Sequence, residues 1–143
     1  MPQFVTEQSC KIKIDLPAKI HSGMEVFYNP AMASNRNIAI LLLNSVENEN
    51  MNIASPLAGS GIRELRFLKE LKLGKAKYIF ANDIKENFPK VFAGNLKLNN
   101  LKKDKLIIHN DDANLFLLNQ VKHGIDDQFC GYFDYIDIDP FGS

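Results

Sequence analysis

Residues 51–67 read MNIASPLAGSGIRELRF, and their pattern indicates the class of fold. Its first five residues have the apolar character of a buried strand, and the glycines that follow indicate a tight turn. Apolar residues then recur with helical spacing, so the stretch predicts a strand, a turn and a helix. The apolar face of this helix comprises Ile62, Leu65, Leu68 and Leu71. Gly74 is expected to cap its end.

The same order of elements repeats along the rest of the chain. AKYIFAN (76–82) is typical of a second strand and is followed by a predicted helix over 88–98. KLIIHN (105–110) predicts a third strand, DANLFLLNQVKH (112–123) a further helix, and GYFDYIDI (131–138) a fourth strand. Strands that alternate with helices at this spacing indicate an α/β fold, with a parallel sheet covered by helices on both faces.

The N-terminal part has a different pattern. KIKIDL (11–16) alternates polar and apolar residues and predicts a small hairpin or arm, and MEVFYN (24–29) is a second extended stretch. Residues 32–46 predict a well-buried helix, with Ile38, Leu41, Leu42 and Leu43 as its apolar residues. We therefore assign residues 1–30 to an N-terminal β arm and residues 31–143 to the α/β domain.

The composition excludes several classes of protein. The 143 residues, 45% hydrophobic and 24% charged, are ordinary for one globular domain. Seventeen basic residues balance seventeen acidic ones, so no global field attracts nucleic acid. The longest apolar run is far too short to cross a membrane, and we expect a cytoplasmic protein without membrane contact. Cys10 and Cys130 are too isolated for a metal site and are expected to be free thiols.

Polar loops follow all four predicted strands. Gly59 and Gly61 allow a close backbone approach after the first strand, Asp83 follows the second, Asp111 and Asp112 the third, and Asp139 the fourth. Ligands of such sheets bind beyond the carboxyl ends of the strands, so the loops should share one rim. Each has an ordinary explanation taken alone: the glycines make a turn, Asp83 caps the next helix, and Asp111 or Asp112 is a helix N-cap.

Together these residues favour a nucleoside cofactor. Asp83 lies about twenty residues beyond the glycine turn, where a carboxylate accepts hydrogen bonds from ribose hydroxyls. A dinucleotide fingerprint requires a third glycine at the position that Glu64 occupies, which argues against a nicotinamide-dependent oxidoreductase. Tight NAD binding without S-adenosylmethionine binding would restore that alternative. S-adenosylmethionine has no phosphate to hold and tolerates a looser turn, and Asp112 is a candidate for the adenine amine.

The triplet Asp139-Pro140-Phe141 suggests the reaction. An exocyclic amine on a nucleobase is a poor nucleophile because its lone pair is delocalised into the ring. Asp139 and a backbone carbonyl beside Pro140 can accept its hydrogens, and Phe141 can stack on the base. The alternative is a strand that simply ends at a proline next to an aromatic residue.

The chain resembles the N-terminal part of the archaeal and eukaryotic tRNA guanine-26 N2-dimethyltransferases. The resemblance rests on VFYNPAMASNRNIAI, LAGSGIRELRF, ANDI, HNDDAN and FDYIDIDPFGS, in the order of that family. It implies a class I, Rossmann-like methyltransferase that places methyl groups from S-adenosylmethionine on N2 of guanine 26, with tRNA as partner. Carried over by motif, the cofactor-binding residues are Arg36, Gly59, Gly61, Arg63, Asp83, Asp112 and Ala113. Asp139 is the catalytic residue, Phe27, Pro140 and Phe141 hold the target base, and no metal is implied.

The chain departs from the family pattern at two positions and in extent. Ser55 stands where the family usually has an acidic residue, and Asn37 where it usually has Asp. The family continues with further strands and a tRNA-gripping domain, so residues 31–143 correspond to the N-terminal half of the methyltransferase domain. We expect the last strand to be an open edge, completed by a second polypeptide if the chain is one half of a split enzyme. In that case we expect the isolated chain to have the cofactor-binding residues but little methyltransferase turnover. The alternative to an enzyme half is a non-catalytic remnant that binds the cofactor or takes part in assembly.

Overall fold

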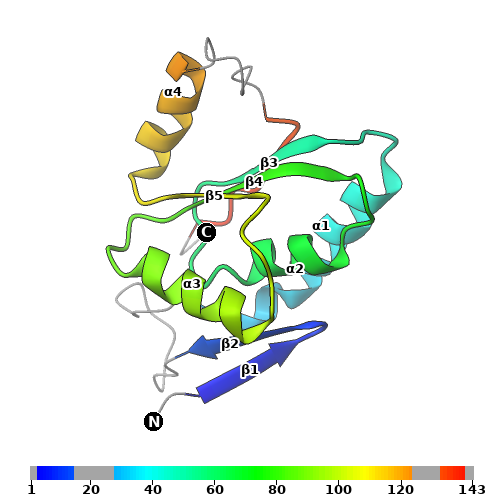
Figure 1. Ribbon diagram of the computed structural model, residues 1–143, viewed down its shortest axis with the longest axis vertical. Coiled ribbons are helices and arrows are strands. Elements are labelled where there is room, and N and C mark those ends of the chain that lie inside the picture. Colours follow the sequence, from blue (N-terminus) through cyan, green and yellow to red (C-terminus); the bar gives the residue numbers. More distant parts are fainter. Residues whose placement is uncertain (1–2, 15–27, 124–132, 141–143) are drawn as a thin grey trace.

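The computed structural model describes residues 3–14, 28–123 and 133–140. A parallel sheet lies in the middle, with α4 on one face and α1, α2 and α3 on the other, and the hairpin β1–β2 lies outside these helices (Figure 1). The strands are β1 Gln3–Glu7, β2 Cys10–Ile14, β3 Met51–Ser55, β4 Ala76–Asn82, β5 Leu106–His109 and β6 Tyr135–Ile136. The helices are the 3-10 turn η1 Pro30–Met32, α1 Ala33–Ser45, α2 Ile62–Glu70, α3 Phe88–Leu98 and α4 Ala113–His123.

The sheet order is β5-β4-β3-β6, and every neighbouring pair is parallel. This confirms the predicted α/β sheet with helices on both faces. Ser55 pairs with Ala81, and Asn82 pairs with His109, so the carboxyl ends of β3, β4 and β5 lie level. The residues that follow the strands are therefore brought to one rim of the sheet.

Both faces of the sheet are packed. Ile53 and Ile79 contact α1 and α2 on one side, and Ala54 and Phe80 pack against Phe116 of α4 on the other. The neighbouring residues Ile53 and Ala54 of β3 are thus buried on opposite faces, as expected for a strand of a parallel sheet that is covered on both sides.

The hairpin shares a core with the helices of the α/β domain. Cys10, Ile12 and Ile14 alternate inward from β2 and belong to the same buried cluster as Leu65 and Phe92. Asparagine side chains in α3 and directly after it also bind the backbone of β2. Lys11 N–H donates to Asn99 Oδ1 at 2.8 Å, and Lys13 N–H donates to Asn95 Oδ1 at 2.9 Å. These asparagines satisfy part of a strand edge that would otherwise be open.

A buried charge network joins the hairpin to α1 and α2. Glu7, 6% exposed, accepts from Arg36 Nε at 2.7 Å and Nη2 at 2.5 Å, and from Arg66 Nη1 at 3.0 Å. Tyr28 Oη also donates to Glu7, and Arg66 pairs with Glu70 at 2.8 Å. Burial by itself would raise the pKa of Glu7, but the hydrogen bonds and charge of Arg36, with those of Tyr28 and Arg66, hold it below its usual value.

Three sequence expectations were wrong in detail. α1 is not well buried: Ile38 is 64% exposed and Leu41 69%, because the structure places the other side of the helix against the sheet. α2 ends at Glu70, so Gly74 does not cap it but occupies a left-handed position (φ +88°) in the turn before β4. β6 is a two-residue strand within the described residues and pairs only with β3 there.

Across the described segments, no helix is long and apolar enough to span a membrane.

The charge network predicts the effect of Glu7→Gln. The change leaves two buried guanidinium groups without their shared carboxylate, and breaking a buried ion pair from one side is strongly destabilising. We expect the free energy of unfolding, measured by urea denaturation at pH 7, to fall by about 3 kcal/mol. Because the pKa of Glu7 is lowered on folding, its contribution is present above about pH 4.5 and is lost as the pH falls further. Glu49→Gln, at an exposed position, is the control; equal stability of the two variants would contradict the network's role.

Gly61 predicts a second effect on stability. Its φ is +76°, and a Cβ atom there would lie 2.4 Å from Cδ2 of Phe92, whose ring is fully buried. Gly61→Ala therefore combines a left-handed backbone with overpacking and should cost about 3 kcal/mol of unfolding free energy. Gly94→Ala in α3, where a Cβ meets nothing within 4 Å, should instead be neutral or stabilise by about 0.5 kcal/mol. Thermal unfolding of both variants checks the contrast.

Candidate functional site

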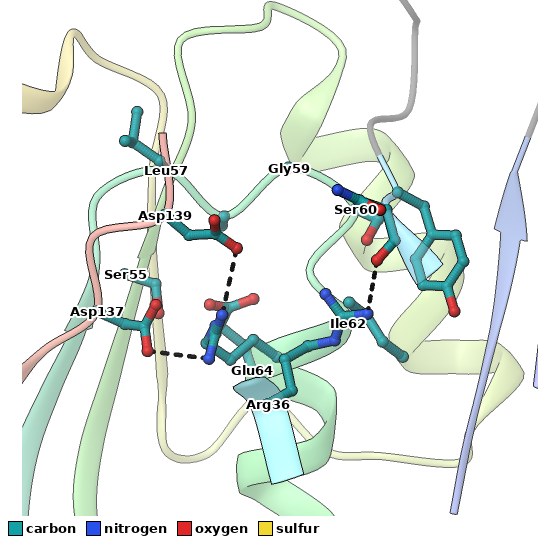
Figure 2. A pocket seen from close by; sticks show the side chains of 13 residues that line it. Arg36, Ser55, Leu57, Gly59, Ser60, Ile62, Glu64, Asp137 and Asp139 are labelled. Carbon is teal, nitrogen blue, oxygen red and sulfur yellow. Dashed lines mark hydrogen bonds and ion pairs between the residues drawn. The ribbon is translucent and has the colours of Figure 1, made fainter. Parts of the chain in front are cut away.

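A pocket lies at the carboxyl ends of β3 and β6. Its walls come from the loop after β3, the first turn of α2, the start of α1 and the segment after β6 (Figure 2). Figure 2 shows Ser55, Glu64, Asp137 and Asp139 around the same space, with Gly59 on the loop above them. Three of these four side chains are acidic, and Arg36 and Arg63 also line the pocket.

The glycine turn is held in place by the end of β4. Gly59 and Gly61 have φ of +58° and +76°, which side-chain-bearing residues rarely adopt. Gly59 N–H donates to Asp83 Oδ2 at 2.8 Å, and Lys85 N–H donates to the other oxygen at 3.0 Å. Asp83 does not cap α3, which begins five residues later at Phe88. Its buried carboxylate instead fixes the turn that forms one wall of the pocket.

Asn82 connects three of the loops at the rim, a role that the sequence analysis did not assign. The residue is fully buried, and its Nδ2 donates at 2.9 Å to the carbonyls of Pro56 and Asp111. Its Oδ1 accepts from Asp111 N–H at 3.0 Å. The available signal was an asparagine at the end of an apolar strand, since a buried amide must find partners for its donors and acceptor. Asn82 therefore ties together the loops after β3, β4 and β5.

Arg63 joins α2 to the segment after β6. Its guanidinium pairs with Asp137 at 3.0 Å and with Asp139 at 3.3 Å, and it donates to Asn35 Oδ1 at 2.9 Å. Tyr135 Oη donates to Asp137 at 2.7 Å; burial, this hydrogen bond and the Asp137 charge raise the pKa of Tyr135 to about 12. The side chain of Asp139 remains 28% exposed, so it faces the pocket mouth while Asp137 lies deeper.

Glu64 is the least expected member of the pocket. It is fully buried, and among the described residues neither carboxylate oxygen has a well-formed hydrogen bond. Burial raises the pKa of Glu64 to about 7, with Asp137 adding to the rise, although the nearby Ser55 hydroxyl and Arg63 oppose it. The Ser55 hydroxyl is likewise unpaired within the described segments. In the sequence, Glu64 had indicated only that the glycine turn does not match a dinucleotide fingerprint.

Asp112 and Ala113 lie elsewhere on the rim, at the start of α4. Asp112 Oδ1 accepts from the N–H groups of Asn114 at 2.9 Å and Leu115 at 3.2 Å, so it is the helix N-cap, one of the two alternatives considered for this pair. Its exposed side chain does not line the pocket of Figure 2. In the part of the chain that the structure describes, no group of three His, Cys, Asp or Glu side chains could hold a metal.

The profile of the family described as N2,N2-dimethylguanosine tRNA methyltransferase matches residues 5–143. The chain belongs to this family. The resemblance found in the sequence is thereby confirmed over almost the whole chain.

Individual relatives agree with the family. A tRNA (guanine(26)-N(2)/guanine(27)-N(2))-dimethyltransferase of Aquifex aeolicus is 38% identical over 145 residues, covering 99% of this chain and 34% of that protein. A tRNA (guanine(26)-N(2))-dimethyltransferase of Methanobrevibacter smithii is 39% identical over 142 residues, covering 97% of this chain and 33% of that protein. The chain thus spans about a third of the length of these relatives.

A solved structure supports the fold. Trm1 from Pyrococcus horikoshii, in complex with S-adenosyl-L-methionine, matches with a TM-score of 0.75 at 32% identity, covering 99% of this chain and 36% of that one. A methyltransferase from Agrobacterium tumefaciens dependent on S-adenosylmethionine has a TM-score of 0.66 at 13% identity and shows the fold alone. The Rossmann-like class expected from the sequence is confirmed.

The structure brings together only part of the predicted site. Arg36, Gly59, Arg63 and Asp139 line one pocket. The Arg36 guanidinium donates to the Glu7 carboxylate in the buried network and to the Asn29 carbonyl at 3.0 Å. Phe27 and Phe141 lie outside the described residues, and Pro140 is exposed.

The raised pKa of Glu64 predicts how stability depends on pH. The folded chain holds this proton up to about pH 7, whereas the unfolded chain releases it near 4.5, so folding stability falls as the pH rises across that interval. Glu64→Gln removes the charge, so the unfolding free energy of the variant should not fall across this interval. The difference in unfolding free energy between the variant and the unchanged chain should therefore be about 3 kcal/mol larger at pH 8 than at pH 4.5, in favour of the variant. Urea denaturation at both pH values measures this difference. A variant with the same pH profile as the unchanged chain would show that Glu64 titrates normally.

Proposed function

We propose that this chain forms the cofactor-side part of an enzyme that methylates N2 of guanine 26 in tRNA with S-adenosylmethionine. The observation that carries the proposal is the pocket itself: a glycine turn held by Asp83 lies beside Asp139, which follows β6, and both belong to motifs of the family. Membership of the family and the named activities of the relatives support the substrate and the cofactor.

The pocket residues fit such a cofactor. The backbone at Gly59 leaves room for close approach, and the two oxygens of Asp83 keep lone pairs beyond those used by Gly59 and Lys85. Glu64 contributes buried carboxylate oxygens that have no described partner, so the pocket offers acceptors for a ligand with hydrogen-bond donors. When bound, the cofactor would supply an electrophilic methyl group on a sulfonium.

Asp139 is proposed as the group that acts on the amine. Its partly exposed carboxylate at the pocket mouth would accept a hydrogen bond from the guanine amine, orient the nitrogen lone pair and receive the proton lost when the nitrogen–carbon bond forms. Arg63 holds Asp139 at 3.3 Å and thereby limits its movement. Phe27 and Phe141 are proposed to hold the base, which must leave the tRNA stack to enter.

Completion of the domain is part of the proposal. β6 has one described sheet neighbour, Ile136 and Ile138 near this edge are exposed, and the outer face of α1 exposes Ile38, Leu41 and Leu42. Such surfaces favour pairing with further strands and helices, from a continuation of the chain or from a second polypeptide. The same surfaces support the alternative function, a cofactor-binding assembly module without turnover of its own.

A cytoplasmic location, where tRNA is abundant, is also proposed.

The test is titration of S-adenosylmethionine into the purified chain by calorimetry. We expect one site per chain and at least tenfold weaker binding by Asp83→Ala, because the variant loses both a ligand acceptor and the anchor of the Gly59 turn. Glu47→Gln, exposed in the loop after α1, is the control and should bind like the unchanged chain. Tight binding of NAD in place of S-adenosylmethionine would reject the proposal in favour of an oxidoreductase.

A further inference from the structure

Glu64 is a carboxylate buried in the pocket without a hydrogen-bond partner in the part of the chain that the structure describes. It is 0% exposed, and no described group makes a well-formed hydrogen bond to either oxygen. Burying an unpaired carboxylate is costly, and natural structures pair such groups with a cation or a donor. The position in the first turn of α2 does not explain the side chain, because it points into the interior and not toward solvent.

The other charges around the pocket are already matched. Arg36 from α1 is paired with Glu7 of the hairpin, and Arg63 from α2 is paired with Asp137 and Asp139 after β6. When ionised, Glu64 therefore adds a negative charge that no described cation neutralises at short range. The pocket has an excess of carboxylate, which suits a ligand with a positive group at its inner end.

We propose that Glu64 binds the ammonium group of the amino-acid end of S-adenosylmethionine. This inference rests on the proposed function. Between the two cationic groups of that cofactor, the ammonium has three N–H donors and can satisfy both oxygens of Glu64, whereas the sulfonium has none. Glu64 lines the same pocket as Gly59, whose N–H is bound by Asp83, so a ligand whose amino-acid end reaches Glu64 can place its adenosine beside the glycine turn.

Ser55 provides an independent reason for this assignment. It ends β3 inside the same pocket, is 2% exposed, and stands where the sequence resemblance leads us to expect an acidic residue. Its hydroxyl lies close enough to Glu64 to affect the pKa of that side chain. A carboxylate from α2 thus lies near Ser55, where an acidic residue at the strand end was expected.

The assignment links cofactor binding to pH. Arg63 favours and Asp137 disfavours ionised Glu64, and Arg36 and Asp139 also line the pocket. With a pKa of about 7 in the free chain, Glu64 must lose its proton to bind an ammonium, so binding near pH 6.5 releases part of a proton. Affinity should rise about sixfold between pH 6 and pH 7.5, because ionisation of Glu64 outweighs the partial loss of the proton from the ligand ammonium.

The experiment compares two ligands on three variants by calorimetry at pH 7.5. Glu64→Gln should bind S-adenosylmethionine at least tenfold more weakly and lose the pH dependence, yet bind 5′-methylthioadenosine, which lacks the amino-acid end, as the unchanged chain does. Ser55→Asp combined with Glu64→Gln returns a carboxylate to the pocket from β3 and should recover most of the affinity. Glu47→Gln again serves as the control, and repeating the titration in buffers of different ionisation enthalpy measures the released proton.

The outcomes separate this inference from the proposed function. Equal affinity of the unchanged chain and Glu64→Gln for S-adenosylmethionine overturns the role of Glu64 alone. Equal losses for both ligands show a structural role and also overturn it. If the unchanged chain binds neither ligand, the proposed function fails and the inference fails with it.

Discussion

The parallel pairing of β3 with both β4 and β6 is the constraint on which the site depends. Because the strands run in one direction, the residues that follow them meet at one rim, although they lie far apart in the sequence. Arg63 and Asp139 are separated by 76 positions and form an ion pair there. Any shift of β6 relative to β3 would separate this pair and open the pocket.

The glycine turn shows how backbone geometry and tertiary packing act together. Gly59 is held by Asp83, which directly follows β4, and Gly61 leaves space that the Phe92 ring of α3 fills. One glycine thus serves the pocket and the other serves the contact between helices. Two residues that look equivalent in the motif have different physical reasons to be glycine.

The distribution of charge separates structure from function. Arg66 and Glu7 are satisfied within the network that fixes the hairpin to α1 and α2, and Arg36 belongs both to that network and to the pocket wall. Glu64 has no such partner among the described residues. A buried polar group whose hydrogen bonds are complete stabilises the fold. A buried polar group that lacks them destabilises it, and a ligand that supplies the missing hydrogen bonds removes this penalty. The hairpin therefore influences the pocket through Arg36, even though it lies on the outer side of the helices (Figure 1).

By itself, the sequence determined the order of strands and helices, the glycine turn and the acidic ends of the strands, because these depend on local periodicity and on turn residues. It predicted β3 and β4 at their observed bounds but misjudged α1, whose apolar residues Ile38 and Leu41 are exposed. Periodicity shows that a face is apolar, but not whether another element covers it. Three features become visible only in the folded chain: Glu7 holds Arg36, Asn82 joins three loops, and Glu64 is buried without a hydrogen-bond partner among the described residues. These facts depend on contacts between distant residues, which no local pattern encodes.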